Sequence, residues 1–190
     1  MKKAFWIFGL LSVFALVALA SSAVKPANFA GTWNLDKEKS QGLDQRMQNV
    51  SVTWTITQDD KQISIDSKVT APPAEAAPAG APSAGGPSGG YGGGRGMGGP
   101  RVYTLDGKEV TAEAGGQMGG SNTTKSSWAN EGKTLELSSV RTGTGRDGTE
   151  FKSTSIDKLS LSGDGKVLTV VRHNEGPRGT QDSTLVFNKQ

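Results

Sequence analysis

Cysteine is absent from the 190-residue chain, and histidine occurs once, at His173. Without thiols the protein can form no disulfide framework, cysteine-ligated zinc site or iron–sulfur cluster, and it has no cysteine nucleophile. A single imidazole also excludes a metal site built from several histidines. We therefore expect neither a metal nor another cofactor.

Catalytic signatures are missing as well. The sequence contains no Gly-x-Ser-x-Gly elbow, no paired-glycine phosphate fingerprint and no His-Glu-x-x-His pattern. His173 lies at the end of a predicted strand, where a solvated histidine is the ordinary interpretation. The candidate carboxylates Asp59, Asp147 and Asp164 lie in predicted turns, where aspartate is favoured for backbone reasons. We expect no catalytic residue, no metal ligand and no enzymatic activity.

The N-terminus carries the longest apolar run of the chain. Lys2 and Lys3 precede apolar residues over 4–20, which end in the small-x-small triplet Ala18-Leu19-Ala20. This pattern is typical of a bacterial secretory signal peptide, here residues 1–23, and the apolar run is short for a permanent anchor, which needs about 20 residues. We expect a secreted or periplasmic protein without a stable membrane span after cleavage.

Excess positive charge is small once this segment is removed. Its loss leaves 19 basic against 18 acidic side chains, and the two signs alternate along the chain. Binding to nucleic acid depends on clustered lysine and arginine that neutralise phosphates. The sequence therefore favours no nucleic-acid partner.

Residues 71–100 lack nearly all the side chains that a core could bury. The segment contains 11 Gly, 7 Ala, 6 Pro and 2 Ser among its 30 residues. This composition predicts a disordered, solvated insertion. We interpret residues 24–70 and 101–190 as the two parts of one domain that the insertion interrupts.

Alternation of apolar and polar residues dominates the rest of the chain and predicts β-strands. In the clearest example, Val52, Trp54 and Ile56 share one face of the segment 50–57, and threonines and a serine occupy the other face. The other predicted strands cover residues 29–35, 62–66, 101–106, 108–113, 123–129, 134–140, 149–161, 167–173 and 183–189.

Turn signals separate several of these strands. Asp106-Gly107, Asp147-Gly148 and Asp164-Gly165 provide the residues that tight hairpin turns require, and they predict antiparallel neighbours. Residues 37–48 are the one helical candidate, with one or two turns at most because Gly42 interrupts them.

Eight to ten two-faced strands can pack as one antiparallel up-and-down β-barrel or as a two-sheet sandwich. The barrel is favoured because the predicted hairpins follow one another without a crossover. Closure also removes edge strands from a chain rich in threonine and valine.

The segment Phe29-Ala30-Gly31-Thr32-Trp33-Asn34-Leu35 resembles the Gly-x-Trp first strand of the lipocalins and the wider calycin barrels. Together with the run over 159–170, it is also similar to small uncharacterised secreted bacterial proteins described as lipocalin-like. The resemblance implies a barrel with Trp33 at its closed end, crossed by a basic side chain from a late strand, for which Arg172 and Lys189 are the candidates. The chain lacks the cysteines, the Thr-Asp-Tyr type motif and the long C-terminal helix of true lipocalins.

Three tryptophans fall on predicted inner faces, where they either pack in the core or contact a ligand. The small hydroxyl side chains predicted to alternate with larger ones inside the barrel leave volume there. We expect a cavity that binds a small amphipathic or hydrophobic ligand. The candidate ligand contacts are Trp33, Trp54, Thr124, Ser126 and Trp128. The alternative is a non-enzymatic structural or interaction protein of the cell envelope, which would use the insertion and the outer strand faces to hold a partner.

Overall fold

The computed structural model describes residues 25–70, 100–113, 120–145 and 148–190. The predicted signal peptide and the predicted insertion, apart from Pro100, lie outside the described residues. The described strands are β1 Gly31–Gln41, β2 Ser51–Gln58, β3 Gln62–Thr70, β4 Arg101–Thr104, β5 Val110–Glu113, β6 Ser121–Ala129, β7 Thr134–Thr144, β8 Glu150–Leu161, β9 Val167–Gly176 and β10 Gly179–Lys189. One helical turn, α1 Gln45–Gln48, lies between β1 and β2.

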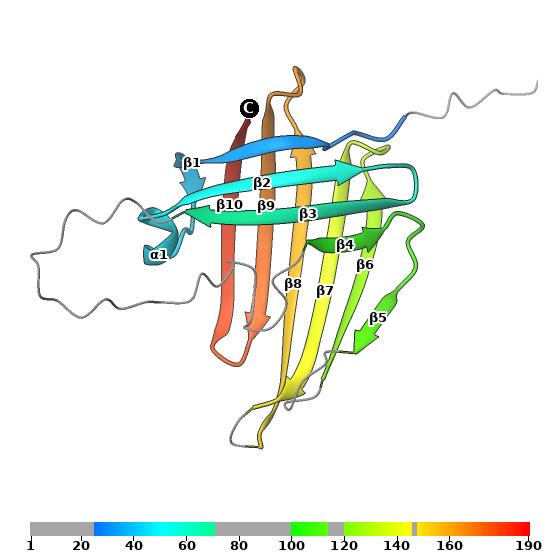
Figure 1. Cartoon of the computed structure of the whole chain (residues 1–190), viewed down its shortest axis with the longest axis vertical. Helices are drawn as coiled ribbons and strands as arrows, with labels where there is room; N and C mark the ends of the chain where they lie inside the picture. Colours follow the sequence, from blue (N-terminus) through cyan, green and yellow to red (C-terminus); the bar gives the residue numbers. More distant parts are fainter. Residues whose placement is uncertain (1–24, 71–99, 114–119, 146–147) are drawn as a thin grey trace, which may run out of the picture.

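All ten strands belong to one antiparallel sheet in the order β4-β3-β2-β1-β10-β9-β8-β7-β6-β5. Each strand therefore pairs with its neighbours in the chain, except that β4 and β5 do not pair with each other, and β1 also pairs with β10. The sheet curls so that β1–β4 lie across the upper part of β6–β10, whose lower parts continue beyond β4 (Figure 1). The all-β, up-and-down, nearly closed barrel confirms the predicted fold class.

The barrel has a seam between β4 and β5, the two edges of the sheet. Gly107 takes a positive φ of 76°, as predicted, but its turn carries the chain across the seam and joins no hairpin. The predicted pairing of these two segments is wrong, because a left-handed glycine permits a turn without deciding which strands pair. Across the seam, Ser126 Oγ donates a hydrogen bond to the Thr104 carbonyl oxygen at 2.5 Å, which links β6 to β4.

The predicted helix over residues 37–48 is wrong in its first half, where β1 continues to Gln41. Pairing with β10 decides this conformation, since Gln41 lies opposite Thr184 and the Val186 N–H donates to Ser40 Oγ at 2.9 Å. Only one turn of helix follows, and the Asp44 carboxylate caps it by accepting the Met47 N–H at 2.8 Å. Among the described residues, no helix is long and apolar enough to cross a bilayer.

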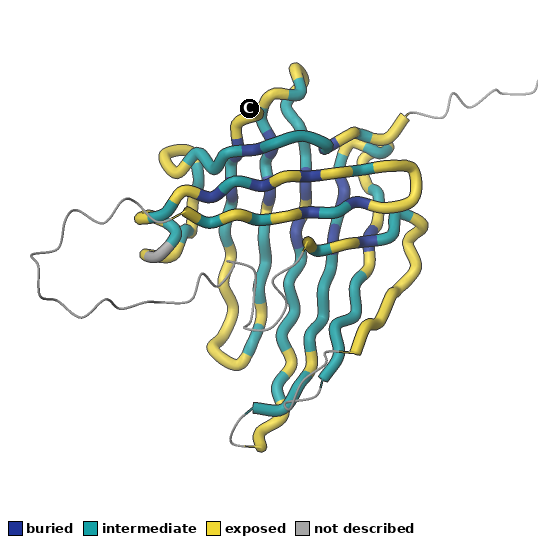
Figure 2. Tube along the Cα trace, viewed as in Figure 1, coloured by how far each residue is buried: buried dark blue, intermediate teal, exposed yellow. Residues whose placement is uncertain are grey.

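The hydrophobic core lies where β1–β4 cross β6–β10, and Figure 2 shows the buried positions gathered there. It is built from the alternating inner positions of the strands, as the period-two pattern predicts. The buried core residues are Phe29, Trp33, Val52, Trp54, Ile56, Ile63, Ile65, Tyr103, Leu135, Leu137, Leu159, Leu168, Val170, Leu185 and Phe187.

Candidate functional site

The inner side chains of β6–β10 form rows across the sheet, because paired residues lie side by side. An apolar row consists of Trp128, Leu135, Leu159, Val170 and Leu185. The charged row beside it consists of Ser126, Leu137, Asp157, Arg172 and Ser183. Two further rows, which we call the polar rows, consist of Thr124, Ser139, Ser155, Asn174 and Gln181, and of Asn122, Arg141 and Ser153.

The charged row contains a buried ion pair. The Arg172 guanidinium holds the Asp157 carboxylate with two hydrogen bonds, from Nε to Oδ1 at 2.6 Å and from Nη2 to Oδ2 at 2.8 Å. Arg101, at the start of β4, reaches Asp157 Oδ2 from the opposite wall with Nη1 at 3.4 Å. These three side chains, the Arg101–Asp157–Arg172 cluster, carry two positive charges and one negative charge.

The Trp54 ring of β2 contacts both arginines of the cluster. The Cζ atoms of Arg101 and Arg172 lie 5.4 and 5.6 Å from the centre of the Trp54 ring, within the range of cation–π attraction. The Phe187 ring packs against the same indole with a centroid distance of 4.6 Å. Trp54 therefore joins the apolar core to the charged cluster.

The cluster keeps its charges at neutral pH. Burial alone would raise the pKa of Asp157, but the hydrogen bonds and charge of Arg172, with the charge of Arg101, outweigh it and lower that pKa. Burial would likewise lower the pKa of Arg172, but the bonds and charge of Asp157 raise it. Since the Asp157 side chain is only 2% exposed and that of Arg101 is 31% exposed, the surplus positive charge lies at Arg101.

Two further polar groups lie beside the cluster. Burial raises the pKa of the Tyr103 hydroxyl, and the nearby positive charge of Arg101 partly opposes this rise. Ser67 of β3 lies opposite Trp54 and in phase with the inner positions Ile63 and Ile65. Its Oγ is buried and has no hydrogen-bond partner. A buried hydroxyl without a partner indicates a place where a water or a ligand atom is expected.

Several side chains of the polar rows can form more hydrogen bonds than they make within the protein. Ser139 Oγ donates to Asn122 Oδ1 at 2.8 Å, which leaves the Asn122 amide hydrogens unused by this bond. In the described part of the chain, the side chains of Ser155, Asn174 and Gln181 make no hydrogen bond to the protein. Ser155 and Asn174 are nevertheless partly buried. The inner face therefore presents polar side chains, among them Ser155 and Asn174 without a partner among the described residues, next to a surplus positive charge.

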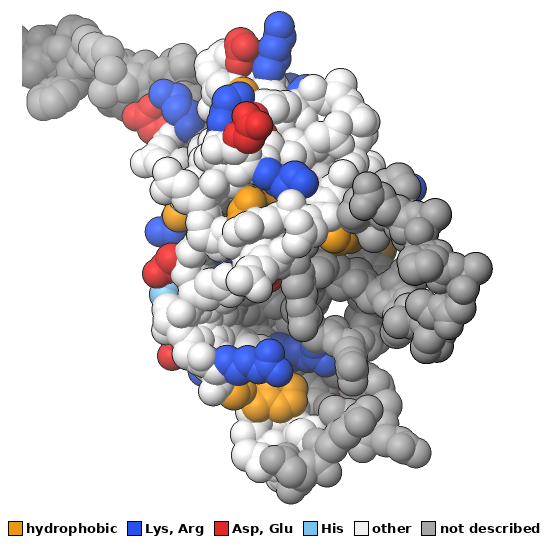
Figure 3. Space-filling model, turned by 90° about the vertical axis from the view of Figure 1, so that its left-hand side faces the viewer, with side chains coloured by type: hydrophobic (Ala, Val, Ile, Leu, Met, Phe, Trp, Pro, Cys, Tyr) orange, Lys and Arg blue, Asp and Glu red, His pale blue; other side chains and the backbone are white. Residues whose placement is uncertain are grey.

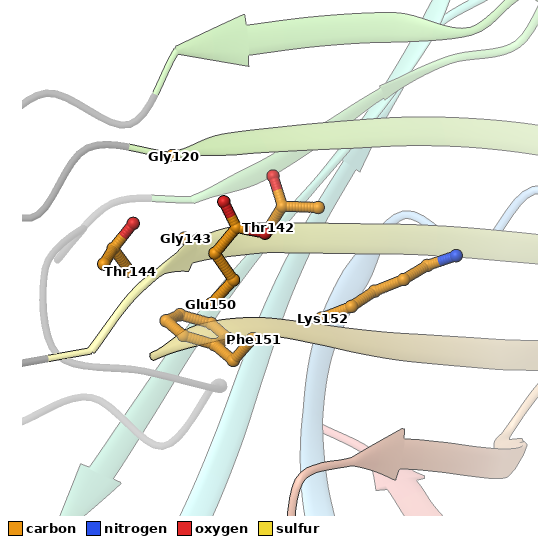
Figure 4. Close-up of a pocket in the computed structure, with 7 residues that line it drawn as sticks. All are labelled: Gly120, Thr142, Gly143, Thr144, Glu150, Phe151 and Lys152. Carbon is orange, nitrogen blue, oxygen red and sulfur yellow. The ribbon is translucent and has the colours of Figure 1, made fainter. Parts of the chain in front are cut away.

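Two open hollows lie beyond the polar rows, and Phe151 at the start of β8 lines both of them. One has a volume of about 490 Å³ and is lined by the ends of β7 and β8, which Figure 4 shows with Phe151 and Glu150 beside Gly143 and Thr144. The other has a volume of about 380 Å³ and lies toward Gly176 at the end of β9. None of the candidate tryptophans lines either hollow.

The structure places two predicted ligand contacts in the core. Trp33 is fully buried and donates from Nε1 to the Phe29 carbonyl oxygen at 2.9 Å. Trp54 is 3% exposed and is covered by the arginines and Phe187. Both positions agree with the packing alternative, and a role in ligand contact stays a prediction for them.

The other three predicted contacts lie around β6. Trp128 is half-buried and stacks on Phe29 with a centroid distance of 6.2 Å. Ser126 is buried and closes the seam through its bond to β4. Thr124 belongs to the polar rows and bonds the Val110 carbonyl oxygen at 3.4 Å. Of the five candidates, only Thr124 therefore belongs to the polar rows.

The two cation candidates take different partners. Lys189 Nζ lies 5.2 Å from the centre of the Trp33 ring, whereas Arg172 lies over Trp54. Gly31 makes room for the lysine, since a Cβ at this position would come within 2.9 Å of Lys189 Cε. Its φ of 145° also favours glycine. The Gly-x-Trp pattern thus has a local physical cause.

Arg101, Asp157 and Ser67 were not expected from the sequence. A usable signal exists for Asp157, because the alternation of β8 places this charge on the inner face between Ser155 and Leu159. A charge at such a position requires a buried partner. For Arg101, 56 residues away along the chain, no local pattern indicates the contact.

No family model and no curated protein matches the chain. Among solved structures, the crystal structure of the zebrafish ileal bile acid-binding protein complexed with cholic acid shares 13% sequence identity with it at a TM-score of 0.46. The match covers 85% of this chain and 98% of the zebrafish chain. At this identity and score, neither ligand nor activity carries over.

Proposed function

We propose that this protein is a binding protein that takes a small amphipathic molecule on the inner face of its barrel, with an anionic group of the ligand at Arg101. The observation that carries the proposal is the surplus positive charge of the Arg101–Asp157–Arg172 cluster. The sequence predicted an amphipathic or hydrophobic ligand, and this charge favours the amphipathic of the two. The signal pattern supports action outside the cytoplasm, and we propose no catalytic step.

Arg101 is suited to hold a carboxylate. Its only bond to Asp157 is long, at 3.4 Å, whereas Arg172 occupies the same carboxylate with two short bonds. A guanidinium offers five N–H donors in a planar fork that matches a carboxylate. The Trp54 ring lies 5.4 Å below the Arg101 Cζ atom. An incoming anion would therefore meet a positioned donor.

The test is a calorimetric titration of the secreted protein with three acids, laurate, benzoate and D-glucuronate. We expect at least one acid to bind, and Arg101→Gln to weaken that binding by about tenfold or more, because a hydrogen bond to a charged group contributes about 1.5–3 kcal/mol. Arg101→Lys keeps the charge without the fork and should retain part of the affinity.

Arg178→Gln is the matched control, since Arg178 is exposed between β9 and β10. It should leave the affinity unchanged. Binding that is equally strong in the wild type and in Arg101→Gln would contradict the proposal, as would the absence of binding for all three acids. Circular dichroism of each variant checks that the barrel is intact.

A further inference from the structure

Beyond the charged cluster, the inner face of β6–β10 is polar over two rows before the next inner residue of β8, the aromatic Phe151. The polar rows contain hydroxyl, amide and guanidinium groups on five neighbouring strands. The two apolar residues in register with these rows are Val110 and Ala112, and both lie on the edge strand β5. A ligand reaching from Arg101 along this face would therefore contact hydrogen-bonding groups.

The described part of the barrel that contains the core, its apolar half, has no open surface on which a hydrocarbon chain could bind. Leu159, Val170 and Leu185 are at most 1% exposed and belong to the packed core. On the face shown in Figure 3, apolar side chains of the described residues form only small separate patches. Between the cluster and Phe151, the inner surface that can still accept contacts is polar.

Side chains without a hydrogen-bond partner in the described part of the protein also lie next to the Arg101–Asp157–Arg172 cluster. The buried Ser67 Oγ lacks a partner on one wall of the barrel, and Ser155 and Asn174 lack side-chain partners on the other wall. Arg101 lies between them, since it bonds Asp157, two residues from Ser155, and pairs with Ile65, two residues from Ser67. One small molecule placed here would meet an arginine and free hydroxyl and amide groups together.

We infer that the ligand is a polyhydroxylated carboxylic acid, a sugar acid of the hexuronate type. This inference rests on the proposed function: it keeps the anionic group of the ligand at Arg101 and replaces the apolar part of the amphipathic molecule by hydroxyl groups. The carboxylate binds Arg101, and the ring hydroxyls replace water on Ser155 and Asn174. Hydroxyl groups suit these side chains because each can donate and accept, as serine and asparagine do.

An acyl chain fits the same surface poorly. It would displace water from the polar rows and supply no hydrogen bonds in return, and removing the partners of polar groups is unfavourable. The four residue steps from Asp157 to Ser153 span about 14 Å along β8, which is long enough for one or two sugar rings. The polar rows therefore distinguish a sugar acid from a fatty acid with the same carboxylate.

The experiment is a calorimetric titration of the secreted protein with D-glucuronate, D-glucose and laurate. We expect glucuronate to bind at least about tenfold more tightly than glucose and than laurate. Ser155→Ala and Asn174→Leu should each weaken glucuronate binding by about threefold to tenfold. Ser160→Ala is the matched control, because Ser160 lies on the same strand in phase with the outer face.

Each result separates this inference from the proposed function. If laurate binds through Arg101 and glucuronate does not, the sugar acid is wrong and the proposed function stands. If glucuronate binds but Ser155→Ala and Asn174→Leu both leave its affinity unchanged, the role of the polar rows is wrong. If glucose binds as tightly as glucuronate, or if no acid depends on Arg101, the proposed function fails together with the inference.

Discussion

The barrel interior has an apolar half, which contains the core, and a polar half, which contains the polar rows. Strands β6–β10 contribute residues to both halves. On β8, Leu159 is completely buried in the apolar half, and Ser155, four residues earlier on the same face, is only partly buried in the polar half. Asp157 stands between them, at the point where the inner face changes from aliphatic to hydroxyl side chains. The alternation that defines a strand decides which side chains point inward. It does not decide whether that interior is filled or left for a ligand.

Stability is concentrated in the apolar half. Burial of a large aliphatic or aromatic side chain contributes about 1.5–3 kcal/mol, and the indoles of Trp33 and Trp54 are both buried there. The polar half contributes little of this kind, because serine and threonine expose few carbon atoms to burial. Substitutions in the two halves should therefore differ strongly in their effect on folding.

The largest effect is expected for Trp33→Ala. Removing this fully buried indole also removes its bond to the Phe29 carbonyl oxygen, and we expect the free energy of unfolding to fall by about 3–5 kcal/mol. Urea unfolding followed by circular dichroism measures it. Ser155→Ala, in the polar half, should change the same quantity by no more than about 0.5 kcal/mol. Similar losses in the two variants would show that the halves share the stability evenly.

The boundary between the halves can be tested with Asp157→Asn. This change leaves the partly buried Arg172 and Arg101 without their shared carboxylate, and we expect a loss of about 3 kcal/mol in unfolding free energy. The double variant Asp157→Leu with Arg172→Met replaces the pair by apolar side chains and should recover much of that loss. If the double variant is as unstable as the single one, unpaired charge is not the cause.

Low pH should also reduce the stabilisation that Asp157 provides at this boundary. The pKa of Asp157 is lowered in the folded state, so the carboxylate stabilises the protein fully above the ordinary aspartate pKa of about 3.9 and loses this contribution as pH falls through the lower folded value. The difference in unfolding free energy between wild type and Asp157→Asn should therefore shrink below about pH 4. Subtracting the variant removes the parallel effect of Asp36, whose pKa is lowered to about 2 by its bonds to Lys39 and Asn188. A difference that is constant down to pH 2 would contradict the assigned ionisation.

The sequence predicts the apolar half better than the polar one. Strict alternation around Trp54, together with the Gly31-x-Trp33 pattern, was sufficient for the strands and for their inner faces. The serines Ser139, Ser153 and Ser155 of β7 and β8 lie in phase with the inner face. The residues that these serines face across the barrel depend on which strand lies opposite, and no local sequence pattern contains that information. The contact of Arg101 with Asp157 and the seam between β4 and β5 both arise from closure of the whole sheet.

The smallest expected effect concerns the apolar end, where Lys189 lies over Trp33 as Arg172 lies over Trp54. The two contacts share their geometry but not their surroundings, because Lys189 is exposed and Arg172 is tied to a buried carboxylate. Lys189→Met should therefore lower the unfolding free energy by only about 0.5–1 kcal/mol, the range of an exposed cation–π contact. Lys68→Met, at an exposed outer position of β3, is the control and should be neutral. A loss for Lys189→Met as large as that for Asp157→Asn would show that the lysine closes the barrel and that the apolar half, too, depends on a charge.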